Sequence, residues 1–415
     1  MVNDIFNSLA NPGGVRQPRG IVKINGEAVR TWLSWTVANN SYYEADTYHV
    51  VFGTSGLPDS YDEVWFSNQT ETFVEILAGF PANVDNPDPN ELTSLIYGRI
   101  DDMEYDPVQR TITLTGRDLT AVFIDARIAT DFANKKASDI VLALAAAHGL
   151  SANVTPTKQP VGNYFNIDHM LLAGGGSEWD LLAALARGEG FVVYVSGQTL
   201  YFGADPTGNA APLTLTYVPP QRPFQTVYRS IATGATQIVE AGGTGSPSGN
   251  FETMSFSRSQ TVAKGITVTV QAAGVYNQTV KKSYPTAPKA ITPGKSSPFG
   301  ATTNYYFNMP AGTALDKLAL RAEAIYNQII SHEMKLRVRL PADATTTPQT
   351  MIQVKGTRTA FDQIYFSKCV TRTMDIEEGF TMDIEAQNTS PNLAPAEKLD
   401  NQPNIPPVVV TATKL

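Results

Sequence analysis

The chain has a single cysteine, Cys369, among its 415 residues, and charged residues make up only 17 % of the sequence. One cysteine cannot form a disulfide within the chain. It stands in the alternating stretch YFSKCVTRTM, which favours a small strand residue over a catalytic thiol. The formal net charge of −8 leaves no basic excess for gripping nucleic acid phosphates. The longest basic runs are the two lysine pairs at 135–136 and 281–282.

Long apolar runs are also missing. No window approaches the roughly 18 apolar residues that a membrane-spanning helix needs. The first residues, MVNDIFNSLANPGG, lack the basic stretch and apolar core of a secretory signal. The sequence therefore predicts a soluble protein made inside the cell, with no membrane partner. A hydrophobic share of 42 % is ordinary for folded proteins, and the length suits two to four domains.

The first part of the chain has the pattern of a turn-rich β-domain. Stretches rich in β-branched and aromatic residues are separated by turn formers, and they predict six strands at 20–24, 31–38, 47–53, 72–80, 94–106 and 110–116. Six strands with short turns predict a small antiparallel barrel or sandwich over residues 19–116. Strict alternation in RTWLSWTV places Trp32 and Trp35 on opposite faces, which predicts that at least one of them lies at an interface.

The pattern changes after Gly116. A helix is predicted at 137–150, with Ser138 as its N-cap and Gly149 at its C-terminal end. A second helix, at 177–190, begins with Ser177 and Asp180 in the spacing of a capping box. The segment 191–203 then has the alternation of a hairpin. Together these elements predict a small α/β module over residues 117–205.

Strand patterns return in the last part, at 213–219, 236–242, 251–260 and 265–274 and in four stretches after residue 334. Between them a long helix is predicted over 313–334, with a capping signature at its start and an apolar face. The signature is Thr313 with Asp316, and the face is Leu315, Leu318, Ala322, Ile325, Ile329 and Met334.

The predicted fold class is therefore mixed and mainly β. Two antiparallel β-barrels, at 19–116 and 206–390, are separated by the inserted α/β module, and the long helix belongs to the second barrel. An N-terminal arm at 1–18 and a Pro-rich C-terminal tail at 391–415 flank them.

No motif for catalysis or metal binding is complete. The stretch GTSGL at 53–57 lacks the last glycine of a nucleophile elbow. The glycine runs at 174–177 and 242–249 lack the lysine of a phosphate loop and are interpreted as linkers. The four histidines have no zinc-ligand spacing: His49, His148, His169 and His332.

One acidic cluster, Asp101, Asp102, Glu104 and Asp106, has carboxylates at near-alternate positions. Such a cluster can bind Ca²⁺ or supply an acid and a base for sugar hydrolysis. It lacks the order of a calcium loop, and a strand end that runs into an Asp-Pro turn is more simply solvated. The sequence predicts no catalytic residue, no metal site and no cofactor site, and a protein that is not an enzyme.

Several stretches together resemble a known family. LTGRDLTAVFIDARIATDF, followed by ASDIVLALAAAHGL, resembles the segment after the first barrel in baseplate hub proteins of contractile-tailed bacteriophages, the late control protein D family. SEWDLLAALARGEGFVVYVSGQTLYFG is similar to a later block of that family. The order of the second half, up to the stretch TMIQVKGTR and the strands after it, is similar too. The resemblance covers roughly residues 20–390, and spike proteins of type VI secretion share this hub fold.

The resemblance implies a mechanical function. Two barrels of the tail-tube type lie in one subunit, and three subunits close a homotrimeric ring that joins the six-fold tail tube to a three-fold central spike. Implied partners are tail tube or tube-initiator proteins, baseplate wedge proteins and the tape measure protein. DNA passes through the bore without specific binding, and the protein belongs to the tail baseplate of a virion assembled in the host cytoplasm. The resemblance also implies that the spike is a separate protein, and it implies no cell-wall hydrolysis.

A different class of protein also fits the strand-rich composition. The alternative is a carbohydrate-binding β-protein that acts at a cell surface. The size of the protein in solution separates the two, because a hub trimerises or joins a baseplate and a lectin-like module is retained by sugar.

Overall fold

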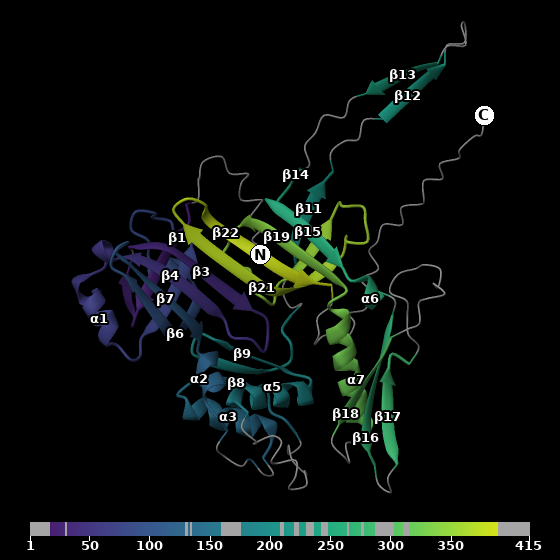
Figure 1. Cartoon of the computed structure of the whole chain (residues 1–415), viewed down its shortest axis with the longest axis horizontal. Coiled ribbons are helices and arrows are strands. Elements are labelled where there is room, and N and C mark those ends of the chain that lie inside the picture. Colours follow the sequence, from purple (N-terminus) through teal and green to yellow (C-terminus); the bar gives the residue numbers. More distant parts are fainter. Residues whose placement is uncertain are drawn as a thin grey trace.

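The computed structural model describes residues 17–29, 31–128, 132, 135–158, 176–207, 211–219, 224–229, 236–241, 248–263, 265–274, 278–286, 303–309 and 315–388. Strands dominate these residues, as Figure 1 shows, and the prediction of a mainly β chain is confirmed. Nearly all of the predicted N-terminal arm, and the whole tail at 391–415, lie outside the described residues. Within the described part of the chain, no helix is long and apolar enough to span a membrane.

The first half forms seven antiparallel strands in the spatial order β3-β4-β7-β6-β5-β1-β2. Their bounds are β1 Arg19–Ile24, β2 Glu27–Val29, β3 Trp32–Asn40, β4 Thr47–Gly53, β5 Phe73–Gly79, β6 Thr93–Asp106 and β7 Thr111–Asp118. All six predicted strands are present, and β2 is an additional short edge strand. Alternating residues of these strands face a common core, which is the pattern expected of a half-buried antiparallel sheet.

The prediction that Trp32 and Trp35 lie on opposite faces is wrong. A β-bulge between Trp32 and Ser34 inserts an extra residue where β3 pairs with β4. An extra residue changes which face the following side chains occupy. Leu33 is therefore exposed, while Trp35 is fully buried and Trp32 packs edge-on against it with ring centroids 6.1 Å apart.

A short helix between β4 and β5 was not predicted. This helix, α1 (Glu63–Asn68), begins at Asp62, whose carboxylate accepts a hydrogen bond from the backbone N–H of Trp65. At six residues it is too short to show a clear helical period in the sequence. Its aromatic side chains pack on Tyr61, with the rings of Tyr61 and Trp65 4.7 Å apart.

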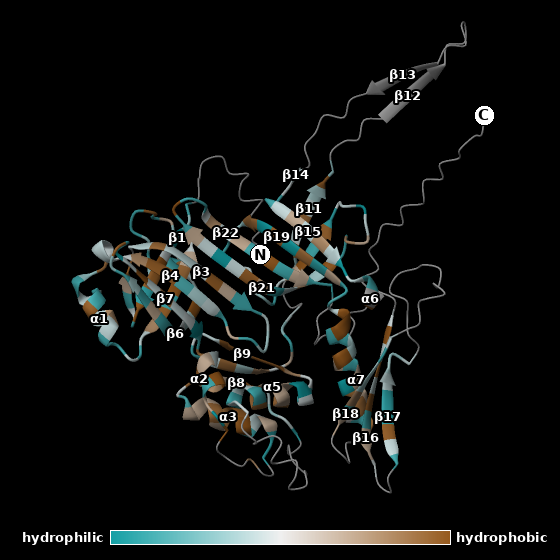
Figure 2. Cartoon of the chain, viewed as in Figure 1, coloured by the Kyte–Doolittle hydropathy of each residue, from teal (hydrophilic) through white to brown (hydrophobic). Residues whose placement is uncertain are grey.

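The second half continues the same sheet. Its strands are β11 Leu213–Val218, β14 Ser248–Gly249, β15 Thr253–Arg258, β19 Met334–Pro341, β20 Met351–Lys355, β21 Ile364–Asp375 and β22 Gly379–Gln387. β21 pairs antiparallel with β3, from Cys369 opposite Asn40 to Asp375 opposite Ser34. This β3–β21 seam joins both halves into one sheet of 14 strands with one continuous core. Figure 2 shows the alternation of hydrophilic and hydrophobic residues along its strands.

Among the described pairings of the large sheet, one departs from the antiparallel arrangement expected of the barrels. β11 and β20 run parallel, with Leu213 opposite Ile352 and Thr216 opposite Lys355. Parallel neighbours require a long crossover connection. The chain between these two strands supplies it, because it contains β15, β19 and an entire inserted unit.

The predicted α/β module packs around a three-stranded sheet in the order β8-β10-β9. Its elements are α2 Thr120–Asp125, α3 Ala137–Ala147, β8 Ser151–Val154, α5 Glu178–Glu189, β9 Val192–Ser196 and β10 Thr199–Gly203. The capping box of Ser177 and Asp180 is present at the start of α5, as predicted. Ser138 is not the cap of α3. Lys136 holds that position, and the hydroxyl of Thr157 instead accepts a hydrogen bond from the backbone N–H of Ser138.

The long helix, α7, covers Leu315–Ile330 and is shorter than predicted. Thr313 lies outside the described residues, and Met334 is the first residue of β19. α7 packs on a separate three-stranded sheet rather than on the large one. This sheet has the order β17-β16-β18, with β16 Ile266–Ala273, β17 Thr279–Tyr284 and β18 Thr303–Met309.

The predicted apolar face of α7 is confirmed from Leu318 onward, whereas Leu315, at the first residue of the helix, is 50 % exposed. Leu318 and Ala322 are fully buried and Ile325 is 6 % exposed, against Val268, Val270 and Ala272 of β16. These residues form a core separate from that of the large sheet. β16, predicted as a strand of the second barrel, therefore belongs to this "α7 unit", which we define as residues 260–333 with the short helix α6 (Gln260–Ala263) at its start.

A two-stranded hairpin stands apart from the body in Figure 1. β12 (Phe224–Arg229), which was not predicted, pairs with β13 (Thr236–Ala241), which was. The strands before and after this hairpin, β11 and β14, pair with each other, with Val218 opposite Ser248. The hairpin is therefore connected to the large sheet at a single point.

Candidate assembly surfaces

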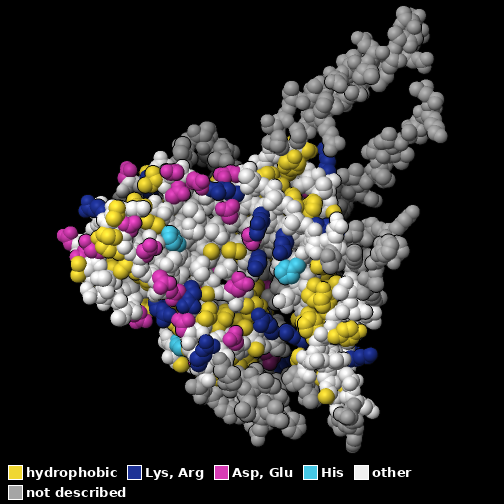
Figure 3. Space-filling view, viewed as in Figure 1, with side chains coloured by type: hydrophobic (Ala, Val, Ile, Leu, Met, Phe, Trp, Pro, Cys, Tyr) yellow, Lys and Arg dark blue, Asp and Glu magenta, His cyan; other side chains and the backbone are white. Residues whose placement is uncertain are grey.

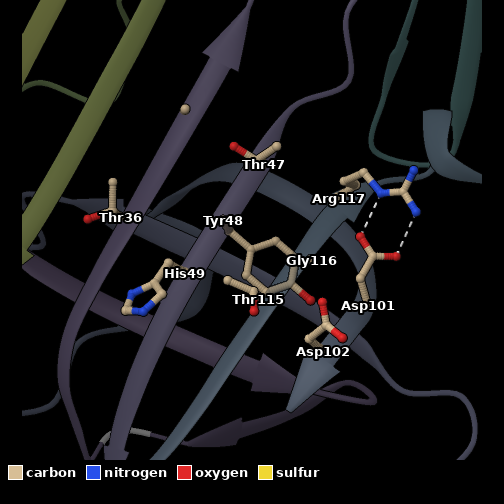
Figure 4. A pocket seen from close by; sticks show the side chains of 10 residues that line it. Thr36, Thr47, Tyr48, His49, Asp101, Asp102, Thr115, Gly116 and Arg117 are labelled. Atoms are coloured by element: carbon tan, nitrogen blue, oxygen red, sulfur yellow. Dashed lines mark hydrogen bonds and ion pairs between the residues drawn. The ribbon is translucent and has the colours of Figure 1, made fainter. Parts of the chain in front are cut away.

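The acidic cluster at the end of β6 is tied into ion pairs. Asp101 accepts two hydrogen bonds from the guanidinium of Arg117, at 2.6 Å from Nε and 2.9 Å from Nη2, as Figure 4 shows. Asp125 of α2 lies 2.6 Å from Arg99 and 3.3 Å from Arg117. These contacts link the large sheet to the first helix of the α/β module.

The rest of the cluster does not converge on one point. Asp106 accepts hydrogen bonds from the backbone N–H groups of Val108 and Gln109 and so shapes the turn that follows β6. Within the described part of the chain, no three His, Cys, Asp or Glu side chains lie close enough together to hold a metal ion. The structure thus gives Asp101 and Asp106 structural partners.

The sheet face opposite the core is open and rich in threonine. Thr36 of β3 and Thr373 of β21 lie opposite each other across the seam, with their hydroxyl oxygens 3.2 Å apart. Thr371 follows on β21, and Thr47 and Thr115 continue the field on β4 and β7. We call Thr36, Thr47, Thr115, Thr371 and Thr373 the threonine field. Figure 4 shows three of them with the exposed His49 between β3 and β7.

Charged side chains flank this field. The acids Asp375, Asp383 and Glu385 lie on β21 and β22, and the bases Arg337 and Arg339 lie on β19. Arg337 pairs with Glu385 at 2.9 Å, and Arg339 lies 3.3 Å from Glu252. Figure 3 shows charges of both signs scattered over this side of the molecule, with broad uncharged areas between them. The exposed Lys335 of β19 lies on the same face, which therefore presents a polar surface with charges of both signs.

A cavity of about 290 Å³ lies where the two halves and the α/β module meet. The buried guanidinium of Arg372 donates hydrogen bonds there to Asn39 Oδ1 at 2.9 Å, to the carbonyl of Asp343 at 2.7 Å and to the carbonyl of Thr346. Asn39 in turn donates to the carboxylate of Asp46 at 2.8 Å. This network spans the seam between the halves.

Two carboxylates in this joint are perturbed. Burial raises the pKa of Asp46 to about 6, although Asn39, Asn40 and Arg372 act in the other direction. Burial, followed by the nearby charge of Asp46, raises the pKa of Asp118 well above its usual range. Burial also lowers the pKa of Arg372. Perturbed groups of this kind mark either functional sites or structural networks, and the full set of partners around Arg372 favours a structural joint.

Each described histidine, and the cysteine, has its own surroundings in the fold. His148 lies 2.6 Å from Glu178 and packs edge-on against the ring of Phe123. Burial and the neighbouring charges of Lys335 and Lys368 lower the pKa of His332. His169 lies outside the described residues. Burial raises the pKa of the Cys369 thiol, which disfavours the reactive thiolate.

Aromatic contacts fix the α/β module against the loop after β3. The hydroxyl of Tyr42 donates to Asp205 at 2.6 Å, and the indole of Trp179 donates to the carbonyl of Tyr43 at 3.0 Å. The guanidinium of Arg187 on α5 stacks 4.5 Å from the ring centre of Tyr43. The sequence gave no signal for these contacts, because they join segments more than 130 residues apart.

No known protein family matches the sequence, and no curated protein matches it. Solved structures do match the fold. A tail protein from Neisseria meningitidis MC58 superposes with a TM-score of 0.61 at 15 % identity, covering 91 % of this chain and 99 % of that one. A 43 kDa tail protein from prophage MuSo2 of Shewanella oneidensis gives 0.60 at 14 % identity, with the same coverage.

A PdpA–VgrG complex from Francisella is also similar. Its TM-score is 0.51 at 8 % identity, and the match covers 93 % of this chain and 61 % of that chain. At these identities the likeness concerns the fold, and it extends over nearly all of the chain. The resemblance to baseplate hub proteins agrees with it, and the chain has the fold of phage tail proteins.

Proposed function

We propose that the protein is a structural baseplate hub of a phage tail, a homotrimeric ring that joins the six-fold tail tube to a three-fold central spike. The observation that carries the proposal is the β3–β21 seam. It places two β-rich halves side by side in one chain, so that three chains present six halves around an axis. Closed symmetric rings are the usual way in which identical chains with unlike contact surfaces assemble.

The ends of the large sheet support ring closure. β2 ends the sheet on the side of the first half, and the second half ends in two edge strands, β14 beyond β11 and β15 beyond β19. Each edge strand has backbone donors and acceptors that its own sheet leaves unpaired, and such edges favour pairing with another chain. In this proposal the halves correspond to two tail-tube-like barrels, at 19–116 and 206–390, with the α/β module at 117–205 inserted between them and the α7 unit at 260–333 inserted in the second.

The open sheet face suits the wall of a DNA channel. Phosphate binding depends on lysines and arginines, and each neutralised phosphate adds salt-dependent affinity. The threonine field carries no such charge, and the flanking arginines Arg337 and Arg339 already face carboxylates. DNA would therefore pass this surface without specific binding. The protein would act mechanically, with no catalytic residue, metal or cofactor.

The proposal implies a set of neighbours in the virion tail. Tail tube or tube-initiator proteins and the tape measure protein would contact one side of the ring, and the spike the other. Baseplate wedge proteins would contact its outside. Assembly would take place in the host cytoplasm.

The test is the mass of the purified full chain, measured by sedimentation velocity and mass photometry, together with electron cryomicroscopy of tails. The proposal expects trimers, and a ring in the tail with three copies of this chain around the channel. A ring with six copies would contradict it, and so would a monomer that is retained on a glycan column and absent from tails.

A further inference from the structure

The large sheet contains the same arrangement of five strands twice. The spatial order is β3-β4-β7-β6-β5 in the first half and β15-β19-β22-β21-β20 in the second. Corresponding strands also follow one another in the same order along the chain, apart from the inserted α7 unit. Every neighbouring pair in both sets is antiparallel. β3 therefore corresponds to β15, and β6 corresponds to β21.

The turns at the ends of β6 and β21 align these two strands residue by residue. Asp106, the last residue of β6, accepts hydrogen bonds from the backbone N–H groups two and three residues later, at 2.8 and 2.9 Å. Asp375, the last residue of β21, accepts the same two bonds, at 2.8 and 2.5 Å. Counted back from these aspartates, Glu104 of β6 corresponds to Thr373 of β21.

The edge that forms the seam in β21 is free in β6. The first residues of β21 pair with β20, and residues 369–375 then pair with β3 on the same edge. β6 likewise pairs with β5 up to Arg99, but no strand in the described part of the chain pairs with this edge over residues 101–106. β15 pairs with β19 and with no other described strand. The two counterparts of the seam strands thus each have a free edge, and Figure 1 shows them on opposite sides of the seam.

The seam shows which backbone groups of β3 make the contact. Ser41, directly after β3, donates its backbone N–H to the carbonyl of Lys368, directly before the paired part of β21, at 2.7 Å. Backbone N–H groups point alternately to the two sides of a strand. The N–H groups of Asn39 and Val37 therefore point to β21, where they lie opposite Val370 and Arg372.

β15 directs its backbone groups in the same way. Ser259, directly after β15, donates its backbone N–H to the carbonyl of Glu333, directly before β19, at 2.7 Å. By the same alternation, the N–H groups of Met254 and Phe256 point away from β19 and toward the free edge. These are the counterparts of Val37 and Asn39, so β15 offers a partner strand the donors that β3 offers β21.

The core-facing side chains of the two free edges are apolar. Tyr105 of β6 lies opposite the fully buried Ile112 of β7, which places it on the core side of the sheet, yet it is 40 % exposed. On β15, the partly buried Met254 and Phe256 pack against the core of the large sheet. A strand laid along β6 with such residues on the same side would extend the core over Tyr105 and remove apolar surface from water.

The open-face side chains are complementary as well. In the register of the seam, Glu104 of β6 lies opposite Thr253 of β15, and Asp102 lies opposite Ser255. A hydroxyl can donate a hydrogen bond to a carboxylate, so no like charges meet across this pairing. The same acids disfavour pairing of β6 with a second β6, because like charges directly opposite each other destabilise a sheet. The partner that fits is the uncharged open face of β15.

We propose that β15 of one copy of the chain pairs antiparallel with residues 101–106 of β6 in the next copy, in the register of the β3–β21 seam. The contact is heterologous, because it joins two different edges of the chain. In a ring of three chains, three such contacts alternate with the three seams within the chains. The inference rests on the proposed trimer and names the strands that hold it together.

The test is disulfide formation between copies of the full chain in a Cys369→Ser background. Glu104→Cys with Thr253→Cys places two thiols opposite each other across the contact, where Cβ atoms are about 4.5–5.5 Å apart. After oxidation this variant should run as a covalent trimer on a denaturing, non-reducing gel. Thr36→Cys with Thr373→Cys, the equivalent pair in the seam, is the positive control and should close a bond within one chain.

Two matched comparisons test the register and the backbone bonds. Asp102→Cys with Thr253→Cys moves one thiol by two residues on the same face, and it should give at least about tenfold less covalent trimer because diagonal Cβ atoms are about 7–8 Å apart. Met254→Pro removes one outward N–H and should weaken trimer formation in sedimentation velocity at least about tenfold. Met254→Ala removes the side chain, keeps the N–H, and should leave trimers in place. Circular dichroism checks that each variant folds.

The outcomes separate this inference from the proposed function. Covalent trimers from the opposite pair and few from the shifted pair would support both. If the wild type sediments as a trimer and the opposite pair stays reduced while the seam control closes, the trimer stands and this strand pairing is wrong. A ladder of covalent species beyond three chains would support the pairing and overturn the three-chain ring. A wild type that is monomeric in solution and in tails would overturn the ring and the pairing together.

Discussion

The large sheet and the α7 unit are built on cores of very different size. The core of the large sheet runs without interruption from β1 to β22, so side chains of the two halves pack against each other. The α7 unit is held by a few residues of its own, chiefly Leu318, Ala322 and Ile325 against β16. Segments with small separate cores open locally at a lower free energy than the whole domain.

The connection between the two regions is narrow. The chain enters the α7 unit after Arg258 and leaves it before Met334, and these two residues lie opposite each other in adjacent strands. A partly buried ion pair closes this neck, with Arg258 Nη2 2.9 Å from Oε1 of the buried Glu333. The chain thus combines a large frame, which contains the seam between the halves, with a side body that has its own small core. That division would suit the proposed ring, whose channel wall must hold its shape.

Trp35→Ala should have the largest effect, because it breaks the frame. Trp35 is fully buried and its ring lies 5.8 Å from that of Phe380, so it joins the two halves. Loss of a buried tryptophan should lower the free energy of unfolding by about 3–5 kcal/mol. Chemical denaturation measures the loss, and hydrogen exchange should show both halves losing protection together. Leu33→Ala, at the exposed neighbour in the same strand, is the control and should cost less than about 1 kcal/mol. Loss of protection in one half alone would contradict a shared core.

Ile325→Asp should have a large effect confined to the α7 unit. The substitution places a charge without a partner in the small core, where burial of an unpaired charge is strongly unfavourable. Hydrogen exchange should rise across β16, β17 and α7 and remain low across β3 and β21. Leu320→Asp, on the exposed side of the same helix, should leave exchange unchanged. Global loss of protection in the Ile325 variant would show that the two regions fold as one.

The sequence predicted many elements of the large sheet and of the α7 unit, but not how these elements pair. Period-two alternation located six of the seven strands of the first half and missed only β2, which has three residues, and the helical period identified most of the buried face of α7. The assignment of α7 to the wrong sheet arose because Leu318 and Ile325 specify an apolar face and not its partner. The bulge at Trp32 and the seam with Arg372 depend on pairing between distant residues, which a single sequence does not display.

Asp46→Asn should change how the stability of the large sheet depends on pH, because Asp46 lies in the buried network around Arg372. The pKa of Asp46 is about 6 in the folded chain and near 4 when unfolded. The folded state thus binds this proton more tightly, and stability falls as pH rises between these values, then stays low above pH 6. The asparagine variant should be more stable than the wild type at pH 7, and the advantage should shrink toward pH 4. Thermal melts across this range measure the difference. An unchanged pH profile would show that Asp46 does not titrate in this way.

Chelation of metal ions should have the smallest effect of all: it should leave the melting temperature of both regions unchanged. Asp101 belongs to the acidic cluster that the sequence offered as a candidate Ca²⁺ site. Both of its carboxylate oxygens accept hydrogen bonds from Arg117. A cation would have to displace that guanidinium from Asp101. It would also need six to eight oxygen ligands if it were Ca²⁺, and one carboxylate supplies two at most. Melting curves of the full chain with EDTA and with added Ca²⁺ should therefore superimpose. The matched comparison is Asp101→Asn, which weakens the pairing with Arg117 and should lower the melting temperature slightly and equally in both conditions. A melting temperature that falls with EDTA in the wild type alone would show that the carboxylates of β6 bind a metal after all.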